Sequence, residues 1–342
     1  MGFIKDHWKG IALCLGIALI AWQAGKLVPV AGGPILGILL GIVLGLLIKD
    51  KRSLAKGTGF VSKKLLQAAV VLLGFGLNFS VVLKTGWRSL PIILGTITIA
   101  LVTAFVLQRA LKVPEKTATL IGVGSSICGA SAIAATAPVV DADDEAVAQA
   151  MSVIFLFNVI AALVFPALGT ALGFSQANGE AFGLFAGTAV NDTSSVTAAA
   201  STWDTLYGLG TQTLDHAVTV KLTRTLAIIP ITLGLSAWRA RTNENAGQKR
   251  NPLKAFPIFM VFFMLASLVT TLASNLGVSG AVFAPLKDLS KFLIIMAMSA
   301  IGLNTDLGKL VRSGAKPILL GFSCWTMITL TSLLLQKLLG IW

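Results

Sequence analysis

Three charged residues lie well inside long apolar stretches of this chain, away from their ends. Asp192 lies in the stretch 182–202, and Lys221 and Arg224 lie in the stretch 216–238. Each charge costs about 2.5–3.5 kcal/mol at the centre of a membrane helix, so such residues usually have a function. Because Lys221 and Arg224 are three residues apart, they share one face of a helix.

These three side chains could bind an anion. An arginine holds a sulfate-like or carboxylate group with two hydrogen bonds, and a lysine adds a point charge. Asp192 would pair with the cations while the site is empty, or carry a coupling proton. The alternative is a structural ion pair, or cationic side chains that extend toward the membrane surface. The net positive charge of the three favours an anion.

Two polar segments interrupt the apolar stretches: 124–131, which is rich in glycine and serine, and 188–195, which contains five consecutive polar residues. Unwound backbone is tolerated at membrane depth only where it is buried in protein or lines an aqueous cavity. Each segment could break a helix and present a half-helix N-terminus, which favours an anion. The alternative is close helix packing through small residues. The predicted substrate-binding residues are Ser125, Ser126, Cys128, Gly129, Ser131, Asn191, Asp192, Thr193, Ser194, Ser195, Lys221 and Arg224.

Other chemistry is weakly represented. Asn78, Asn158 and Asn304 are secondary candidates for substrate binding or ion coupling, although an intramembrane asparagine equally often joins helices. No nucleotide loop, metal-ligand spacing or catalytic set is found in the sequence. We therefore expect no enzyme activity and no cofactor, and transport would be coupled to H⁺ or Na⁺ or be passive.

The elements that carry these residues are predicted to be membrane helices. The chain has 342 residues, 55% hydrophobic and only 12% charged, whereas soluble domains carry about 25% charged residues. We predict one all-α polytopic domain over 1–342, with about eleven transmembrane helices, two of them discontinuous. The predicted spans are 11–27, 34–48, 63–84, 91–111, 117–139, 146–172, 182–202, 216–238, 254–275, 287–306 and 316–340.

Charge sets the predicted orientation. The net charge of +13 reflects basic loops on the cytoplasmic side rather than nucleic-acid binding. The loops near 49–64, 109–116, 239–254 and 309–316 are basic, whereas the loop at 141–145 is acidic and is expected outside. The N-terminus is then cytoplasmic and the C-terminus outside. We take the first apolar run as an uncleaved helix rather than a signal peptide.

Two internal similarities indicate repeats. Gly-Leu-Asn at 76–78 and Pro-Ile-Ile-Leu-Gly at 91–95 return 226 residues later, at 302–304 and 317–321. The predicted spans run in opposite directions, which favours an inverted repeat over chance similarity. The segment from Gly124 also resembles the segment from Gly187, 63 residues later. That pair would run in the same direction, so the span model is wrong there, one segment is re-entrant, or the similarity is only chemical.

The motifs at 125–140, 182–200, 217–230 and 296–321 together resemble the YeiH-type bacterial membrane proteins, a family described as sulfate exporters. The resemblance implies a multi-pass bacterial inner-membrane transporter related to the bile-acid, arsenite and riboflavin transporters. It implies inverted repeats, two discontinuous helices that cross at the substrate site, and a core that shifts against a panel. Proteins of this type often form homodimers.

The sequence therefore predicts a secondary active transporter of a small anion such as sulfate, sulfite, or an organic sulfonate or carboxylate. Export is the direction that the resemblance implies. The partners would be the anionic substrate and the lipid bilayer, with no nucleic acid. The alternative is a channel, or a membrane sensor that binds an anion without active transport.

Overall fold

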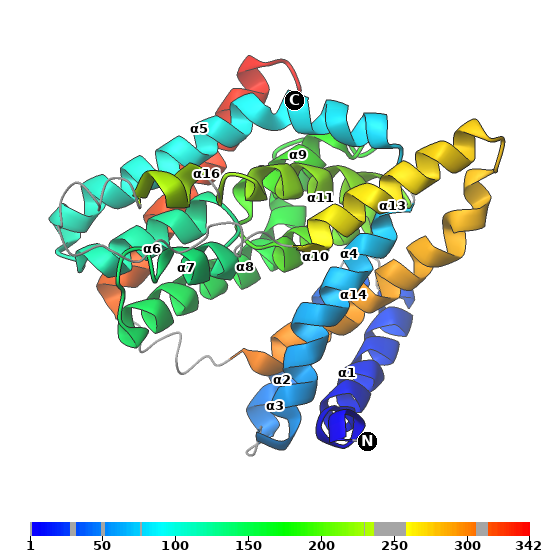
Figure 1. The fold of residues 1–342 in the computed structure, drawn as a ribbon, viewed down its shortest axis with the longest axis horizontal. Helices are drawn as coiled ribbons and strands as arrows, with labels where there is room; N and C mark the ends of the chain where they lie inside the picture. Colours follow the sequence, from blue (N-terminus) through cyan, green and yellow to red (C-terminus); the bar gives the residue numbers. More distant parts are fainter. Residues whose placement is uncertain are drawn as a thin grey trace.

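The computed structural model describes residues 2–27, 32–48, 52–75, 77–228, 230–235, 258–305 and 314–342. Every regular element in these ranges is a helix, and the helices form two groups that lie side by side (Figure 1). We call these groups the panel unit and the hairpin unit.

The panel unit combines the first helices of the chain with two later ones. Its members are α1 (Gly2–Leu27), α2 (Gly32–Leu47), α3 (Arg52–Phe60), the π-helical turn η1 (Val61–Leu65), α4 (Leu66–Gly74), α13 (Ile258–Asn275), the short η3 (Gly280–Phe283) and α14 (Ala284–Asn304). The closest packing joins α2 to α14. A Cβ on Gly37 would lie 3.1 Å from the carbonyl oxygen of Ile295, so glycine lets these two backbones approach.

The hairpin unit contains all the predicted charged site residues. Its members are α5 (Phe79–Leu111), α6 (Glu115–Ser126), α7 (Ala130–Thr136), α8 (Asp144–Ala171), α9 (Glu180–Ala189), α10 (Thr193–Tyr207), α11 (Gln212–Thr225) and α16 (Ala315–Leu338). As expected from the sequence, the helix breaks after Ser126 and again after Ala189.

Contacts between distant segments define two ends of the bundle, end A and end B. At end A, the Thr58 hydroxyl of α3 donates to Asn304 Oδ1 at the end of α14, at 2.7 Å. At end B, the Phe79 amide at the start of α5 donates to Thr271 Oγ1 near the end of α13, at 2.8 Å. The 33-residue α5 runs from end B to end A, a length of about 50 Å.

The segment predicted to cross at 117–139 does not run through the bundle. Lys116, at the start of α6, donates from Nζ to the carbonyl oxygen of Asp141 at 2.5 Å. Asp141 follows α7, so α6 and α7 form a hairpin that enters from end A and returns to end A. We call it hairpin 1 (115–141). A through-running helix would separate these two residues by about 38 Å.

The predicted seventh span also folds back. Phe182 in the first turn of α9 stacks on Trp203 near the end of α10, with ring centroids 4.0 Å apart. Asp204 then accepts hydrogen bonds from the amides of Thr213 and Leu214, both at 2.9 Å, which places the start of α11 beside the end of α10. We call residues 180–207 hairpin 2, which enters from end B and returns to end B.

These hairpins correct the predicted topology. The eleven-span count treated both segments as crossing helices, because composition and length do not distinguish a crossing helix from a hairpin. The acidic loop at 141–145, predicted opposite the basic loop at 109–116, lies at the same end A and pairs with it through Lys116. Asp/Glu residues contribute little to orientation, so an acidic loop does not fix the side of a membrane.

One predicted span boundary also changes. The third span was expected to continue to residue 84, but α4 ends at Gly74 and α5 begins at Phe79. The reason is a local cap, since the Asn78 side chain accepts a hydrogen bond from the Ser80 amide at 2.8 Å. Pro91 was expected to open a span and instead lies inside α5. Gly76, the loop 239–254 and most of the loop 309–316 lie outside the described residues.

The described helices suit a membrane. Five of them are long and apolar enough to cross one, by length and composition: His7–Lys26, Phe79–Leu111, Glu145–Ala171, Gln212–Leu235 and Ala315–Leu338. Many large apolar side chains point outward, including Leu47 at 70% exposure and Trp87 at 77%. An exterior of this kind is stable against lipid and would be costly against water.

Candidate functional site at the hairpin tips

The tips of the two hairpins meet in the interior of the hairpin unit. Hairpin 1 turns at Gly129, whose φ of 71° and ψ of −125° favour glycine. A Cβ there would lie 3.5 Å from Asp192 Cβ in the turn of hairpin 2. Because the hairpins enter from opposite ends, their breaks lie between end A and end B.

Arg224 of α11 joins the two tips. Its Nε donates to the Ser126 carbonyl oxygen and its Nη2 to the Ser125 carbonyl oxygen, both at 2.7 Å. Its Nη1 donates to the carbonyl oxygen of Thr188 in α9. The side chain is fully buried. The guanidinium therefore binds the C-terminal ends of α6 and α9 together.

Lys221, one turn earlier on α11, reaches the same place. Its Nζ donates to the Ile127 carbonyl oxygen at 3.3 Å, and the side chain has no exposed surface. Asp192 lies close enough for its charge to interact with that of Lys221. The shared helix face predicted for Lys221 and Arg224 is what allows both to contact hairpin 1.

Asp192 is the N-cap of α10. Its side chain accepts from the Ser194 amide at 3.0 Å and from the Ser194 hydroxyl. Its own amide donates to Asn158 Oδ1 of α8 at 3.2 Å. The carboxylate therefore already accepts from one of the free amides at the N-terminus of α10, the half-helix end that was expected to attract an anion.

Two side chains at the tips have unused hydrogen-bonding capacity. Neither amide atom of Asn191 has a partner among the described residues, and Asn191 is 1% exposed. The Ser125 hydroxyl is likewise without a partner and fully buried. Buried polar groups are normally paired, so these two side chains retain hydrogen-bonding capacity beside the tips.

The structure brings most of the predicted site residues together. Those buried at or next to the tips are Ser125, Ser126, Cys128, Gly129, Asn191, Ser194, Ser195, Lys221 and Arg224. Asp192 and Thr193 are half-buried, and Ser131 is exposed on α7. Of the secondary candidates, only Asn158 contacts the tips.

Asn78 and Asn304 lie away from this site. Asn78 caps α5 at end B, and Asn304 accepts from Thr58 at end A. Both side chains therefore have a local structural role at the ends of their helices. The two asparagines lie at different kinds of helix end, since Asn78 is the N-cap of α5 and Asn304 is the last residue of α14.

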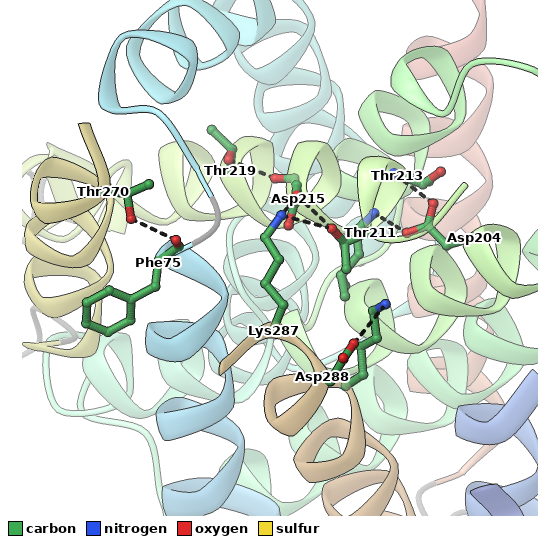
Figure 2. A network of polar contacts seen from close by, with 11 residues as sticks. Phe75, Asp204, Thr211, Thr213, Asp215, Thr219, Thr270, Lys287 and Asp288 are labelled. Atoms are coloured by element: carbon green, nitrogen blue, oxygen red, sulfur yellow. Dashed lines mark hydrogen bonds and ion pairs between the residues drawn. The ribbon is translucent and has the colours of Figure 1, made fainter. Parts of the chain in front are cut away.

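A polar network that was not predicted from the sequence joins the two units at end B. Lys287 of α14 pairs with Asp215 of α11, with Nζ 3.5 Å from Oδ2 (Figure 2). The Thr211 hydroxyl donates to the same oxygen at 3.0 Å. The units also meet where α10 packs against α2 and α14, and where α13 packs against α5. The Lys287–Asp215 pairing had no local signal because its residues are 72 positions apart.

The fold and site define a multi-pass helical membrane protein with two opposed helical hairpins. Residues 9–321 match the family described as conserved hypothetical protein 698. The chain is 54% identical to UPF0324 membrane protein FN0533 of Fusobacterium nucleatum, over 99% of this chain and 100% of that protein. It is 57% identical to a UPF0324 membrane protein of Streptococcus pneumoniae, over the full length of both. The chain therefore belongs to this family of bacterial multi-pass membrane proteins, to which the YeiH-type proteins are similar.

Proposed function

We propose that the protein is a secondary transporter of a small anion, such as sulfate, sulfite, or an organic sulfonate or carboxylate. The observation that carries the proposal is the meeting of two opposed hairpin tips around the buried Lys221 and Arg224, beside the unpartnered Asn191. Secondary transporters place broken helices and their ligand site near the membrane midplane.

The internal repeats support this architecture. The segments that begin at Gly124 and Gly187 resemble each other. The first belongs to hairpin 1, which enters from end A, and the second belongs to hairpin 2, which enters from end B. The re-entrant alternative therefore accounts for the apparent same-direction repeat. Likewise α4 runs toward end B and α14 toward end A. The proposal has nine crossing segments and two re-entrant hairpins, arranged as inverted repeats.

The proposed anion site uses fewer cations than the sequence suggested. All three of the Arg224 donor atoms already hold backbone carbonyl oxygens. The groups left for the anion are the Lys221 ammonium, the Asn191 amide and the Ser125 hydroxyl, all of which can donate hydrogen bonds. Arg224 positions the tips rather than binding substrate.

The orientation follows from the basic residues of end A. Lys112, Lys116 and Lys316 all lie at this end, so the positive-inside rule favours a cytoplasmic end A. The N-terminus would then be inside and the C-terminus outside. Export of the anion, transport without enzyme activity, and a homodimer remain parts of the proposal.

The test is flux of labelled anions in liposomes that contain the purified protein, under defined pH and ion gradients. We expect saturable uptake of at least one oxyanion, lost in Lys221→Ala. Asp288→Ala, which changes a largely exposed residue of α14, serves as the control. Saturable binding without flux would favour a sensor, single-molecule currents would favour a channel, and neither flux nor binding would reject the proposal.

A further inference from the structure

Four backbone carbonyl oxygens at the hairpin tips are bound by cationic side chains. Three of them accept from Arg224, and the fourth, on Ile127, accepts from Lys221. Three of the four lie at the C-terminal end of α6, and Thr188 lies in the last turn of α9. Two helix C-termini therefore meet at one pair of cations.

Two such ends in one buried place repel each other. The last four carbonyls of a helix have no partner within it, and the helix end carries roughly half a negative charge. Bringing α6 and α9 together in the interior therefore concentrates about one negative charge. A buried cation offsets this repulsion, and Arg224 supplies one that donates a hydrogen bond from each of its three nitrogens.

In secondary transporters, unwound carbonyls and half-helix C-termini of this kind coordinate the Na⁺ that drives transport. Here the carbonyl oxygens are occupied by side chains of the same chain. The guanidinium keeps its charge at every physiological pH. A Na⁺ ion could bind these oxygens only by displacing a fully buried arginine.

A comparison of the two repeats shows that only one of them carries these cations. At 63 residues before Lys221 and Arg224, the equivalent positions on α8 are Asn158 and Ala161. Only the second repeat therefore carries cations, and they reach across to the carbonyls of the first. Asn158 instead holds the backbone of the opposite tip, through the Asp192 amide.

We infer that Lys221 and Arg224 act as built-in cations at the position where a sodium-coupled transporter binds Na⁺, so that this protein works without sodium. The inference rests on the proposed function, because it assigns the coupling of the transport site. It leaves the proton as the ion that can exchange there. The ionisable groups that face Lys221 are Asp192, Cys128 and Arg224.

The test compares the purified protein in sodium, potassium and choline chloride at equal ionic strength. We expect the same melting temperature in all three salts, and the same anion flux with and without a sodium gradient. A saturable rise in melting temperature specific to Na⁺, or flux that requires Na⁺, would overturn the inference.

A variant tests the role of the arginine directly. Arg224→Ala should lower the melting temperature by on the order of 10 °C, because it uncovers buried carbonyls. Millimolar methylguanidinium should restore it, whereas choline should not. Arg88→Ala, at an exposed position on α5, should change neither. Failure of methylguanidinium to act on a folded variant would contradict the role. If Arg224→Ala does not fold, Arg224→Lys, which keeps a cation, should be more stable than the neutral Arg224→Met. Equal stability of these two variants would contradict the role.

The outcomes separate the two proposals. A melting temperature that does not depend on sodium, with no flux for any anion, would reject transport and retain the inference that Lys221 and Arg224 replace Na⁺. Flux that depends on sodium would keep transport and reject the built-in cations.

Discussion

At the scale of single residues, the buried cations at the hairpin tips already bind partners within the protein. Arg224 is balanced by the carbonyl ends of α6 and α9, which leaves Lys221 and Asp192 as the charges that the proposed anion would meet. An anion beside this pair is favoured when Asp192 is protonated, because the carboxylate then no longer repels it.

This charge balance predicts the effect of Asp192→Asn. In the wild type, anion affinity should rise as pH falls, by up to about tenfold per pH unit for a single coupled proton. The variant carries a permanently neutral side chain, so its affinity should be high and nearly independent of pH. Binding titrations at several pH values measure this. Asp288→Asn should keep the wild-type dependence, and a wild-type slope in Asp192→Asn would exclude the carboxylate as the proton carrier.

Asn191 offers a second residue-scale prediction. Its buried amide has no partner among the described residues, so Asn191→Leu should leave the melting temperature unchanged or raise it. If the amide binds the anion, affinity should fall by roughly 10-fold to 100-fold, the equivalent of about 1–3 kcal/mol. Thermal melting and binding on the same samples separate the two effects.

The comparison with Asn158 completes the test. Asn158→Leu removes the acceptor of the Asp192 amide, so it should lower stability as well as affinity. If Asn191→Leu behaved in the same way as Asn158→Leu, the Asn191 side chain would be part of the packing rather than of the anion site.

At the scale of elements, glycines decide how close α2 and α14 lie. Gly302→Leu should destabilise the protein by about 1–3 kcal/mol, because even a Cβ would collide with the Ile38 carbonyl oxygen. Thermal or denaturant unfolding measures the change. Gly16→Leu, in α1 with open space around the added carbon, should be neutral, and equal effects of the two changes would contradict this packing.

The hairpins make a prediction about sidedness. Cysteines introduced at Lys116 and Asp141 should react with an impermeant thiol reagent from the same face of the membrane, and one at Asn178 from the opposite face. The three native cysteines, Cys14, Cys128 and Cys324, are buried and should stay unlabelled. Labelling of positions 116 and 141 from opposite faces would restore a crossing helix at 117–139.

At the scale of the whole molecule, the described contacts between the two units include the Lys287–Asp215 pair at end B and the packing of hairpin 2 on the panel unit. Transport by relative movement of the units would have to change these contacts. A flexible bismaleimide that joins cysteines at positions 215 and 287 should therefore stop flux. Each single-cysteine variant with the same reagent is the control, and full flux in the crosslinked protein would show that these positions need not separate.

The sequence determined the membrane class, the two helix breaks, and the cationic face of α11. These follow from composition, from clustered glycine and serine residues, and from a spacing of three residues, all of which are local properties. The sequence also identified Asn191 and Asp192, since a run of polar residues in an apolar stretch is conspicuous without any structure.

Only the tertiary structure decided that the breaks are the turns of hairpins, and that Arg224 donates to carbonyl oxygens of both hairpins. Both depend on contacts between distant residues, such as Lys116 with Asp141 and Arg224 with Ser125. A broken helix and a re-entrant hairpin have the same local sequence pattern. What separates them is whether the second half packs beyond the first or alongside it, and that depends on the surrounding helices.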